Sequence, residues 1–529
     1  MVFFSLQFAS FLLVLLALYY GAGRLFPRYQ WVVLLVGSIA FYLIMGGWPA
    51  IIFMVVTALA TWGGSHLMAR FSAQANEARK AAKGREEKKA VKAAFARKRR
   101  LVLVGVLAVT LGMLGYLKYW NTILFNFGLA ESTHSLGIML PLGISFYTFI
   151  SLGYLIDVYN EKYGVEPNFA RFFLYVSWFP QILQGPINRF DAISSQLFAE
   201  RHADWYGMRR GLLRMGYGFF KKYGIANVLV GNYLAVFSHV TESTPSPAIL
   251  TGILLYTVYM YADFSGGIDI VEGASELFGI EMAPNFRQPY FSTSLAGYWR
   301  RWHMSLGAWM RDYVFYPLAV CKPMRSLNRH ATKALGKQIG RTIAACVANV
   351  VVFVIVGLWH GAEWHFLAWG LYNGIIIALS DLLAPTFDRI SERLHINKEA
   401  IWYRIFAIIR TMTIVSIGRF FDCIEGMDTV WLAMRDTVCN LTAWGFKANL
   451  EEAGVTFADT LGFAPIVIVA CVVVFIISLC YERGIDVRAT ILSQRLSMRV
   501  ALYLVLGVIF FISMSFAINV EEVFLYAFF

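Results

Sequence analysis

Long apolar blocks separated by short charged segments dominate this 529-residue chain. A block of about 20 apolar residues crosses the ~30 Å hydrocarbon core of a bilayer as one helix. Because the shorter blocks must tilt or kink, the pattern predicts an all-α integral membrane protein with roughly eleven or twelve crossings. The blocks lie near 3–23, 30–46, 48–64, 101–118, 136–157, 169–187, 211–238, 246–262, 342–361, 364–384, 401–421, 461–481 and 500–519.

The stretch from 263 to 320 interrupts the apolar blocks. It contains DFSGG, PNFRQPY and WRRWHMSLGAWMRDYVFYP, which are rich in Gly, Pro, Arg and aromatic residues. Irregular polar backbone at membrane depth persists only where protein or a water-filled cavity surrounds it, so we predict re-entrant helices here. Helical spacing within the stretch predicts one aromatic face. Its members are Trp299, Trp302, His303, Leu306, Trp309, Met310 and Tyr313.

Composition supports the membrane class and narrows the partners. The chain is 58% hydrophobic and 15% charged, which is typical of a polytopic membrane protein. The net charge of +13 lies in short segments between apolar blocks, as the positive-inside rule produces, so we expect no nucleic-acid partner. The six cysteines form no CxxC pair, which argues against a metal ribbon or a redox motif. Cys423 and Cys439 would pair only in an extracytoplasmic loop.

Basic segments predict the orientation of the chain. Residues 70–100 carry far more Lys and Arg than Glu, so this loop is expected in the cytoplasm. Met1–Gly21 has no A-x-A cleavage site and should remain as a first helix, which places the N-terminus outside. Arginines between 483 and 499 place the C-terminus outside as well. The basic stretch 322–341 is expected inside, so the block that ends near His360 runs outward.

His360 is costly at this depth unless a partner, a cavity or a function compensates for its desolvation. From this segment alone, a structural hydrogen bond and a functional role both stay open. His360 and His365 are five residues apart, about 140° around a helix, so a zinc site is not expected. Glu363 and His365 are expected at the extracytoplasmic mouth as solvated or paired groups. Asp263 is expected, with Ser265, to satisfy backbone groups in a broken helix.

Five segments carry the most specific motifs of the chain: PLGISFYTFISLGYLIDVY (141–159), WFPQILQGPINRF (178–190), YADFSGGIDIVEGASELFGIEMAPNFRQPY (261–290), WRRWHMSLGAWMRDYVFYPL (299–318) and GLWHG (357–361). Together they resemble one family, the bacterial membrane-bound O-acyltransferases, in the branch with alginate O-acetylase and the lipoteichoic-acid D-alanyl transferase. The resemblance runs from about residue 1 to 420. It implies a membrane tunnel closed by re-entrant helices, an essential histidine at His360, and a second polar position at His303. An imidazole suits general-base catalysis near neutral pH, whereas His303 would orient the acyl carbonyl, assist proton transfer or line the tunnel.

Basic residues in the fourth segment suggest where the acyl donor binds. Arg300, Arg301 and Arg311, with Trp302 among them, are expected to hold a phosphate of acetyl-CoA or of an acyl-phosphopantetheinyl carrier protein. A salt bridge to Asp312 or contacts with lipid headgroups are the alternative. No tightly bound cofactor and no metal are expected.

The last residues resemble a tail found in Gram-positive members of the family. Phe524, Tyr526 and Phe529 form FxYxxF, which implies that Tyr526 carries the acyl group covalently. A phenol, with a pKa of about 10, is a workable nucleophile when a histidine removes its proton, and a good leaving group afterwards. The alternative is an aromatic anchor at the membrane interface.

The sequence therefore predicts three parts: a catalytic core over 1–422, an extracytoplasmic loop or lid over 423–460, and C-terminal transmembrane helices with the tail over 461–529. The resemblance implies transfer of an acyl group, most simply acetyl, from a cytoplasmic thioester through His360 and Tyr526 to an extracytoplasmic SGNH-hydrolase-like partner. A cell-surface polysaccharide would be the final acceptor, at a bacterial plasma membrane. The alternatives are D-alanyl transfer to teichoic acid and, from another class, a flippase of a cell-wall precursor. A flippase would need neither His360 nor Tyr526.

Overall fold

The computed structural model describes residues 5–129, 140–237, 240–242, 244–441 and 457–515, and within these ranges the chain is helical with no strand. Nine of the described helices are long and apolar enough to cross a membrane. The all-α membrane class is thereby confirmed. The nine helices are α1 (Leu6–Leu25), α2 (Gln30–Ala81), α3 (Arg85–Asn126), α10 (Ser246–Glu276), α14 (Lys322–His360), α15 (Trp364–Arg393), α16 (Ile401–Cys423), α19 (Phe457–Glu482) and α21 (Leu496–Met514).

Within the described residues, fewer membrane-length helices form than the apolar blocks predict, for identifiable reasons. The blocks 30–46 and 48–64 share α2, which is kinked at Gly47, where φ is +73°. The block 169–187 is divided because the Phe179 N–H bonds to the Ser38 hydroxyl and Pro180 starts a new helix. A π-helical turn that begins at the buried Lys222 interrupts the block 211–238. The shorter helices are α5 (Phe169–Ser177), α6 (Phe179–Leu183), α8 (Trp205–Lys221), η2 (Lys222–Ala226) and α9 (Asn227–Phe237).

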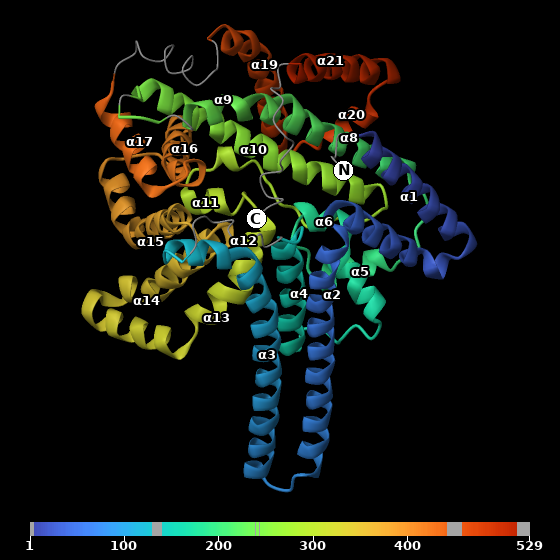
Figure 1. The fold of residues 1–529 in the computed structure, drawn as a ribbon. Helices are drawn as coiled ribbons and strands as arrows, with labels where there is room; N and C mark the ends of the chain where they lie inside the picture. Colours follow the sequence, from blue (N-terminus) through green and yellow to red (C-terminus); the bar gives the residue numbers. More distant parts are fainter. Residues whose placement is uncertain (1–4, 130–139, 238–239, 243, 442–456, 516–529) are drawn as a thin grey trace. The chain divides into compact units, whose positions relative to one another are not determined.

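The chain divides into two compact units. The first contains the described residues up to Leu212 together with Val271–Ala283, and the second contains Leu213–Ile270 and the described residues from Pro284 onward. In the first unit, α2 and α3 form a long antiparallel hairpin, and α4 (Ile144–Tyr159) packs against both helices (Figure 1).

Glycine allows a close approach where α4 begins. Gly143 has φ +66°, and a Cβ there would lie 2.2 Å from the carbonyl oxygen of Ile182. Only glycine fits this left-handed position against the α6 backbone. The contact ties the PLGISF segment to the FPQ segment, the two motifs of the first unit that carry the family resemblance.

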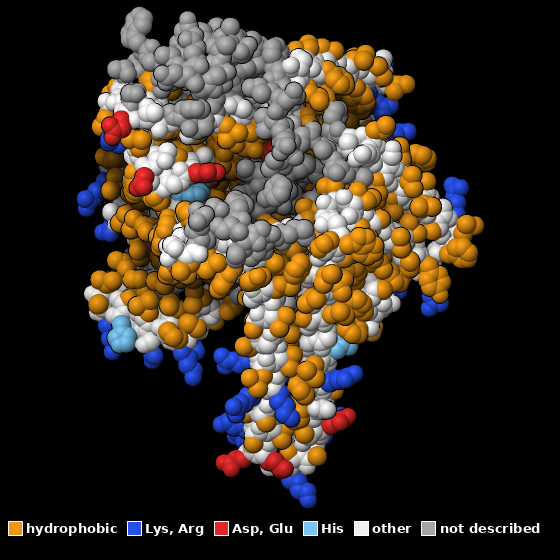
Figure 2. Space-filling view, viewed as in Figure 1, with side chains coloured by type: hydrophobic (Ala, Val, Ile, Leu, Met, Phe, Trp, Pro, Cys, Tyr) orange, Lys and Arg blue, Asp and Glu red, His pale blue; other side chains and the backbone are white. Residues whose placement is uncertain are grey.

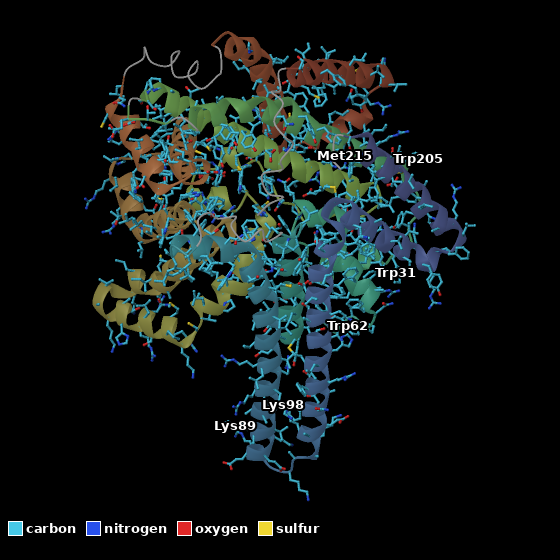
Figure 3. The ribbon with its side chains drawn as sticks, in the orientation of Figure 1. Trp31, Trp62, Lys89, Lys98, Trp205 and Met215 are labelled. Atoms are coloured by element: carbon cyan, nitrogen blue, oxygen red, sulfur yellow. The ribbon has the colours of Figure 1, made fainter. Side chains whose placement is uncertain are left out.

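The end of the α2–α3 hairpin is a basic arm, defined here as residues 69–100. Its Lys and Arg side chains are exposed apart from Arg99, which is partly covered. Figure 2 shows blue side chains gathered at this end of the hairpin, and Figure 3 locates Lys89 and Lys98 on α3. At 1.5 Å per residue, the helix from 69 to 81 extends about 20 Å past the apolar part of α2.

In the second unit, α14 and α15 form the most extensive helix pair. A Cβ added to Gly357 would lie 2.3 Å from the carbonyl oxygen of Phe366, so the two backbones meet at van der Waals distance. His360 is the last residue of α14 and follows this contact by less than one turn. The remaining helices of this unit include α11 (Leu295–Trp299), α12 (Met304–Met310), α13 (Tyr316–Ala319), α17 (Met427–Cys439) and α20 (Val487–Ser493).

Candidate active site

A sharp turn between α11 and α12 places His303. The predicted aromatic face over 299–313 is wrong, because no continuous helix forms there: His303 is left-handed, with φ 45° and ψ 52°, and caps the start of α12. The neighbouring segment 285–287 instead forms hydrogen bonds with backbone groups that a continuous helix would pair internally. The Arg287 N–H donates to the Arg301 carbonyl, and the Met304 N–H donates to the Asn285 carbonyl. A non-glycine residue with positive φ is uncommon and marks a tightly constrained position.

The His303 imidazole is buried in an aromatic and polar pocket. It lies edge-to-face with Phe264 at 4.8 Å between ring centroids and 6.0 Å from the Trp359 ring. Its Nδ1 lies 3.2 Å from Asn285 Oδ1. His303 falls outside the candidate membrane spans, and burial lowers its pKa to about 3, because the charged form loses its hydration. The imidazole is therefore neutral at physiological pH.

His360 also contacts the Trp359 ring. Its ring centroid is 4.8 Å from Trp359, 5.2 Å from Trp369 and 6.0 Å from Phe366, with which it stacks. The structure thus brings His303 and His360, which are 57 residues apart in sequence, into contact with one Trp359 side chain. His360 is only partly buried, so it is accessible in a way that His303 is not.

The turn after His360 is fixed by close packing. A Cβ on Gly361 would lie 2.5 Å from Cδ2 of the Phe366 ring, so this ring would have to shift to admit a side chain at the last glycine of GLWHG. His365 does not lie at a solvated mouth: it is 6% exposed, and its Nδ1 donates to the Phe421 carbonyl at 2.7 Å. This bond ties the start of α15 to the end of α16. Glu363 is partly exposed.

A buried arginine lies beside the His303 turn. Arg419 donates to Tyr298 Oη at 2.9 Å and to Asp422 Oδ2 at 2.7 Å, and its guanidinium lies 5.2 Å from the Trp302 ring. Trp302 is 2% exposed and stacks on Tyr298 at 5.5 Å. Sequence reasoning missed Arg419, although a charge inside the apolar block 401–421 was a visible signal.

A basic cavity of about 980 Å³ adjoins the same turn. It contains Arg300 and Arg301, two of the predicted donor-binding residues, and Met304, which directly follows His303. Acidic groups compensate part of its charge, since Glu482 lies 2.5 Å from Arg301 and 3.8 Å from Arg404. Its cationic side chains are Arg287, Arg300, Arg301, Lys398 and Arg404, and its hydroxyl side chains are Ser292, Thr293 and Ser294.

Two other predicted donor-binding residues do not line this cavity. Arg311 forms an ion pair with Asp312 at 2.9 Å, the alternative that the sequence left open. Trp302 lies in the buried aromatic cluster with Tyr298 and Arg419. Sequence reasoning missed Arg287, Lys398 and Arg404, because they come from loops and helices distant in sequence from the WRRWH motif.

The helix that carries DFSGG is unbroken, contrary to expectation, since α10 continues to Glu276. Asp263 forms a buried ion pair with Lys222, and Ser265 Oγ accepts a hydrogen bond from Lys221 at 2.8 Å. Charged side chains buried away from water require a partner, because an isolated buried charge is strongly unfavourable. The pairs hold the π-helical turn η2 against α10, which is a structural role. Tyr526 lies outside the described residues.

Comparisons with known proteins agree with the motifs. A family model described as the membrane-bound O-acyltransferase family matches residues 160–336. The probable alginate O-acetylase of Pseudomonas aeruginosa is 32% identical over 383 residues, which are 70% of this chain and 64% of that protein. The probable alginate O-acetylase of Azotobacter vinelandii is 31% identical over 431 residues, 80% and 75% of the two chains. The teichoic acid D-alanyltransferase of Bacillus subtilis is 26% identical over 286 residues, 52% and 67%.

Proposed function

Since the chain belongs to the membrane-bound O-acyltransferase family, we propose that it transfers an acetyl group from a cytoplasmic thioester toward a cell-surface polysaccharide. The observation that supports this proposal most strongly is that His303 and His360 both contact the Trp359 ring. Met304, the residue after His303, lines the adjoining basic cavity. Two imidazoles beside an anion-binding cavity suit a thioester donor that carries phosphate. The alginate O-acetylases named above support acetyl as the acyl group and a polysaccharide as the acceptor.

The charge of the basic cavity favours acetyl-CoA as the donor. Coenzyme A carries three phosphate groups, whereas phosphopantetheine on a carrier protein carries one phosphodiester. The cavity contains five cationic side chains and the carboxylate of Glu399. An excess of guanidinium groups and several hydroxyls match a ligand with multiple phosphates.

His360 is the general base of the proposed mechanism. Its imidazole removes the proton of the acceptor hydroxyl as the oxygen attacks the thioester carbonyl, so a C–O bond forms and the C–S bond breaks. The proton then passes to the departing thiolate, which leaves as free coenzyme A. Positioned proton transfer of this kind contributes about 10²–10⁴-fold to the rate.

The first acceptor in this proposal is Tyr526. The acetyl-tyrosine passes its group to the serine of an extracytoplasmic SGNH-hydrolase-like partner, which acetylates the polymer. This route requires the C-terminal tail outside and the basic arm inside, in a bacterial plasma membrane. The FxYxxF spacing of Phe524, Tyr526 and Phe529 supports the relay.

Intact-mass measurement tests the proposal directly. The purified chain in nanodiscs is incubated with acetyl-CoA, and each protein is then digested to locate any added acetyl mass. The wild-type chain should carry one acetyl group on its C-terminal peptide, and Tyr526→Phe and His360→Ala should not. Normal loading of Tyr526 in His360→Ala would show that the base is another group.

D-alanyl transfer to teichoic acid is the second candidate, and the Bacillus subtilis relative is the observation that favours it. Its match covers only about half of this chain, which is why acetyl transfer is preferred. If acetyl-CoA gives no transfer, and a D-alanyl carrier protein does, the second candidate replaces the first. A flippase would translocate a precursor at the same rate in wild type and His360→Ala.

A further inference from the structure

Three polar atoms lie within hydrogen-bonding distance of one oxygen atom at the start of α12. Asn285 Oδ1 lies 3.1 Å from the Ser305 backbone nitrogen, 2.8 Å from Ser305 Oγ and 3.2 Å from His303 Nδ1. Asn285, His303 and Ser305 are all buried. Because burial removes competing water, the hydrogen-bonding roles within this group are set by the groups themselves.

The Ser305 backbone decides which end of the Asn285 amide faces this group. A backbone N–H can only donate, so its partner must be the carbonyl oxygen and not the NH₂ nitrogen. A carbonyl oxygen can only accept. The His303 Nδ1 that faces the same oxygen must therefore carry a hydrogen, since otherwise two lone pairs would face each other.

A neutral imidazole carries one hydrogen, so a hydrogen on Nδ1 leaves the lone pair on Nε2. The His303 side chain is neutral in this buried place, as its environment requires. Its Nε2 is consequently an acceptor. An acceptor cannot donate a hydrogen bond to a developing acyl oxyanion, but it can accept a hydrogen bond from an O–H or N–H group.

We propose that Asn285 is a positioning residue that holds His303 in its Nδ1–H form, so that Nε2 presents a lone pair in the active site and serves as a hydrogen-bond acceptor, not as a donor to the acyl oxygen. The inference rests on the proposed place of His303 in the active site. It excludes a hydrogen bond from His303 that orients the acyl carbonyl, one of the roles that the sequence left open for this residue.

The same asparagine also holds the backbone of the turn. The Asn285 carbonyl accepts from the Met304 N–H, directly after the left-handed His303. The side-chain oxygen accepts from the Ser305 N–H, one of the first-turn donors that a helix cannot satisfy itself. Asn285 thus fixes both the position of the His303 backbone and the orientation of its ring.

Three substitutions separate the tautomer from simple support of the fold. Asn285→Leu removes the acceptor at similar volume and should lower kcat about 10²-fold, as the loss of one oriented hydrogen-bonding group in an active site does. Asn285→Asp keeps an acceptor, and activity should stay within about tenfold of wild type. Ser305→Ala is the matched control: it removes one donor to Asn285 and leaves the His303 contact, so activity should stay within about threefold.

Nitrogen NMR of ¹⁵N-histidine-labelled protein in nanodiscs reads the tautomer independently of activity, and His303→Gln identifies the signal. The wild type should show hydrogen on Nδ1, and Asn285→Leu should show a gain of the Nε2–H form. In Asn285→Asp the carboxylate should raise the pKa of His303 and move the acidic limb of the pH–rate profile upward.

The outcomes distinguish this inference from the proposed function. Hydrogen on Nε2 in the wild type, or wild-type tautomer and activity in Asn285→Leu, overturns the role of Asn285. Full activity of His303→Gln instead removes His303 from the proposed mechanism, while the NMR signal still reports the tautomer. If Asn285→Leu does not fold, the pH profile of Asn285→Asp decides, and an unshifted profile contradicts the inference.

Discussion

At the scale of single residues, Trp359 connects the two candidate catalytic histidines through ring contacts. His303 is deeply buried and constrained by a left-handed backbone, whereas His360 is partly exposed at a helix end. The two imidazoles therefore differ in their surroundings. In the proposed mechanism, His303 accepts a hydrogen bond and His360 removes the proton of the incoming hydroxyl.

Arg419 provides a prediction at this scale. Removing one partner of a buried ion pair commonly costs about 3–5 kcal/mol, because the other charge stays buried without compensation. Arg419→Leu should therefore lower the thermal midpoint strongly, since Asp422 loses its partner at 2.7 Å. The double substitution Arg419→Leu with Asp422→Leu should recover much of the loss. Thermal unfolding in detergent measures both, and a double variant no more stable than the single one contradicts the prediction.

Gly357 provides a second prediction about a single residue. A methyl group there would meet the Phe366 carbonyl oxygen at 2.3 Å and force α14 and α15 apart. Gly357→Ala should destabilise the protein by about 1–3 kcal/mol, as overpacking does, and should reduce acyl transfer because His360 ends α14. Gly112→Ala is the control in α3, where a Cβ meets nothing within 4 Å. The control should be neutral or stabilising by about 0.5–1 kcal/mol.

At the scale of elements, hydropathy located the long membrane helices and failed where specific backbone bonds intervene. The block 342–361 ends where α14 ends, at His360. The block 169–187 is no single helix, because Ser38 accepts the N–H of Phe179 from a distant position in the sequence. Helical periodicity also failed over 299–313, where the segment 285–287 competes for hydrogen bonds.

The candidate site was predictable only in part, for the same physical reason. His303 and His360 stood out because each lies in a specific motif, and Arg300 and Arg301 because charge is rare at such depth. Asn285 gave no signal, since its role depends on a turn 18 residues away. Lys398 and Arg404 were hidden because a cavity lined by separate elements has no pattern along the chain.

The basic cavity gives a prediction about an assembled element. A charge-assisted hydrogen bond to phosphate is worth about 1.5–3 kcal/mol, so Arg287→Gln and Arg300→Gln should each raise KM for acetyl-CoA about tenfold or more, with kcat less affected. Arg311→Gln is the matched control, because Arg311 pairs with Asp312 and does not line the cavity. Steady-state kinetics at low and high salt measure the effect. Equal changes in KM for Arg300→Gln and Arg311→Gln would contradict a donor site here.

At the scale of the whole molecule, the basic arm is the main basis for the predicted orientation of the chain in the membrane. Headgroups occupy only about 5–8 Å on each side of the hydrocarbon core, whereas the arm extends about 20 Å past the apolar part of α2. Its lysines are therefore predicted to reach beyond the lipid, on the cytoplasmic side that the positive-inside rule indicates. Tyr526 would then face the other side only if an odd number of crossings separates it from the arm.

Cysteine labelling tests this arrangement. In a variant without the six native cysteines, Lys89→Cys should react with a membrane-impermeant maleimide in inverted vesicles and not in intact cells. A cysteine placed after Phe529 should show the opposite pattern, because an acetyl-tyrosine that serves an extracytoplasmic partner must be outside. Labelling of both positions from the same side would exclude transfer across the membrane through Tyr526, and the tyrosine would then be an interfacial anchor. A detergent-permeabilised sample, in which both cysteines react, confirms that each is chemically accessible.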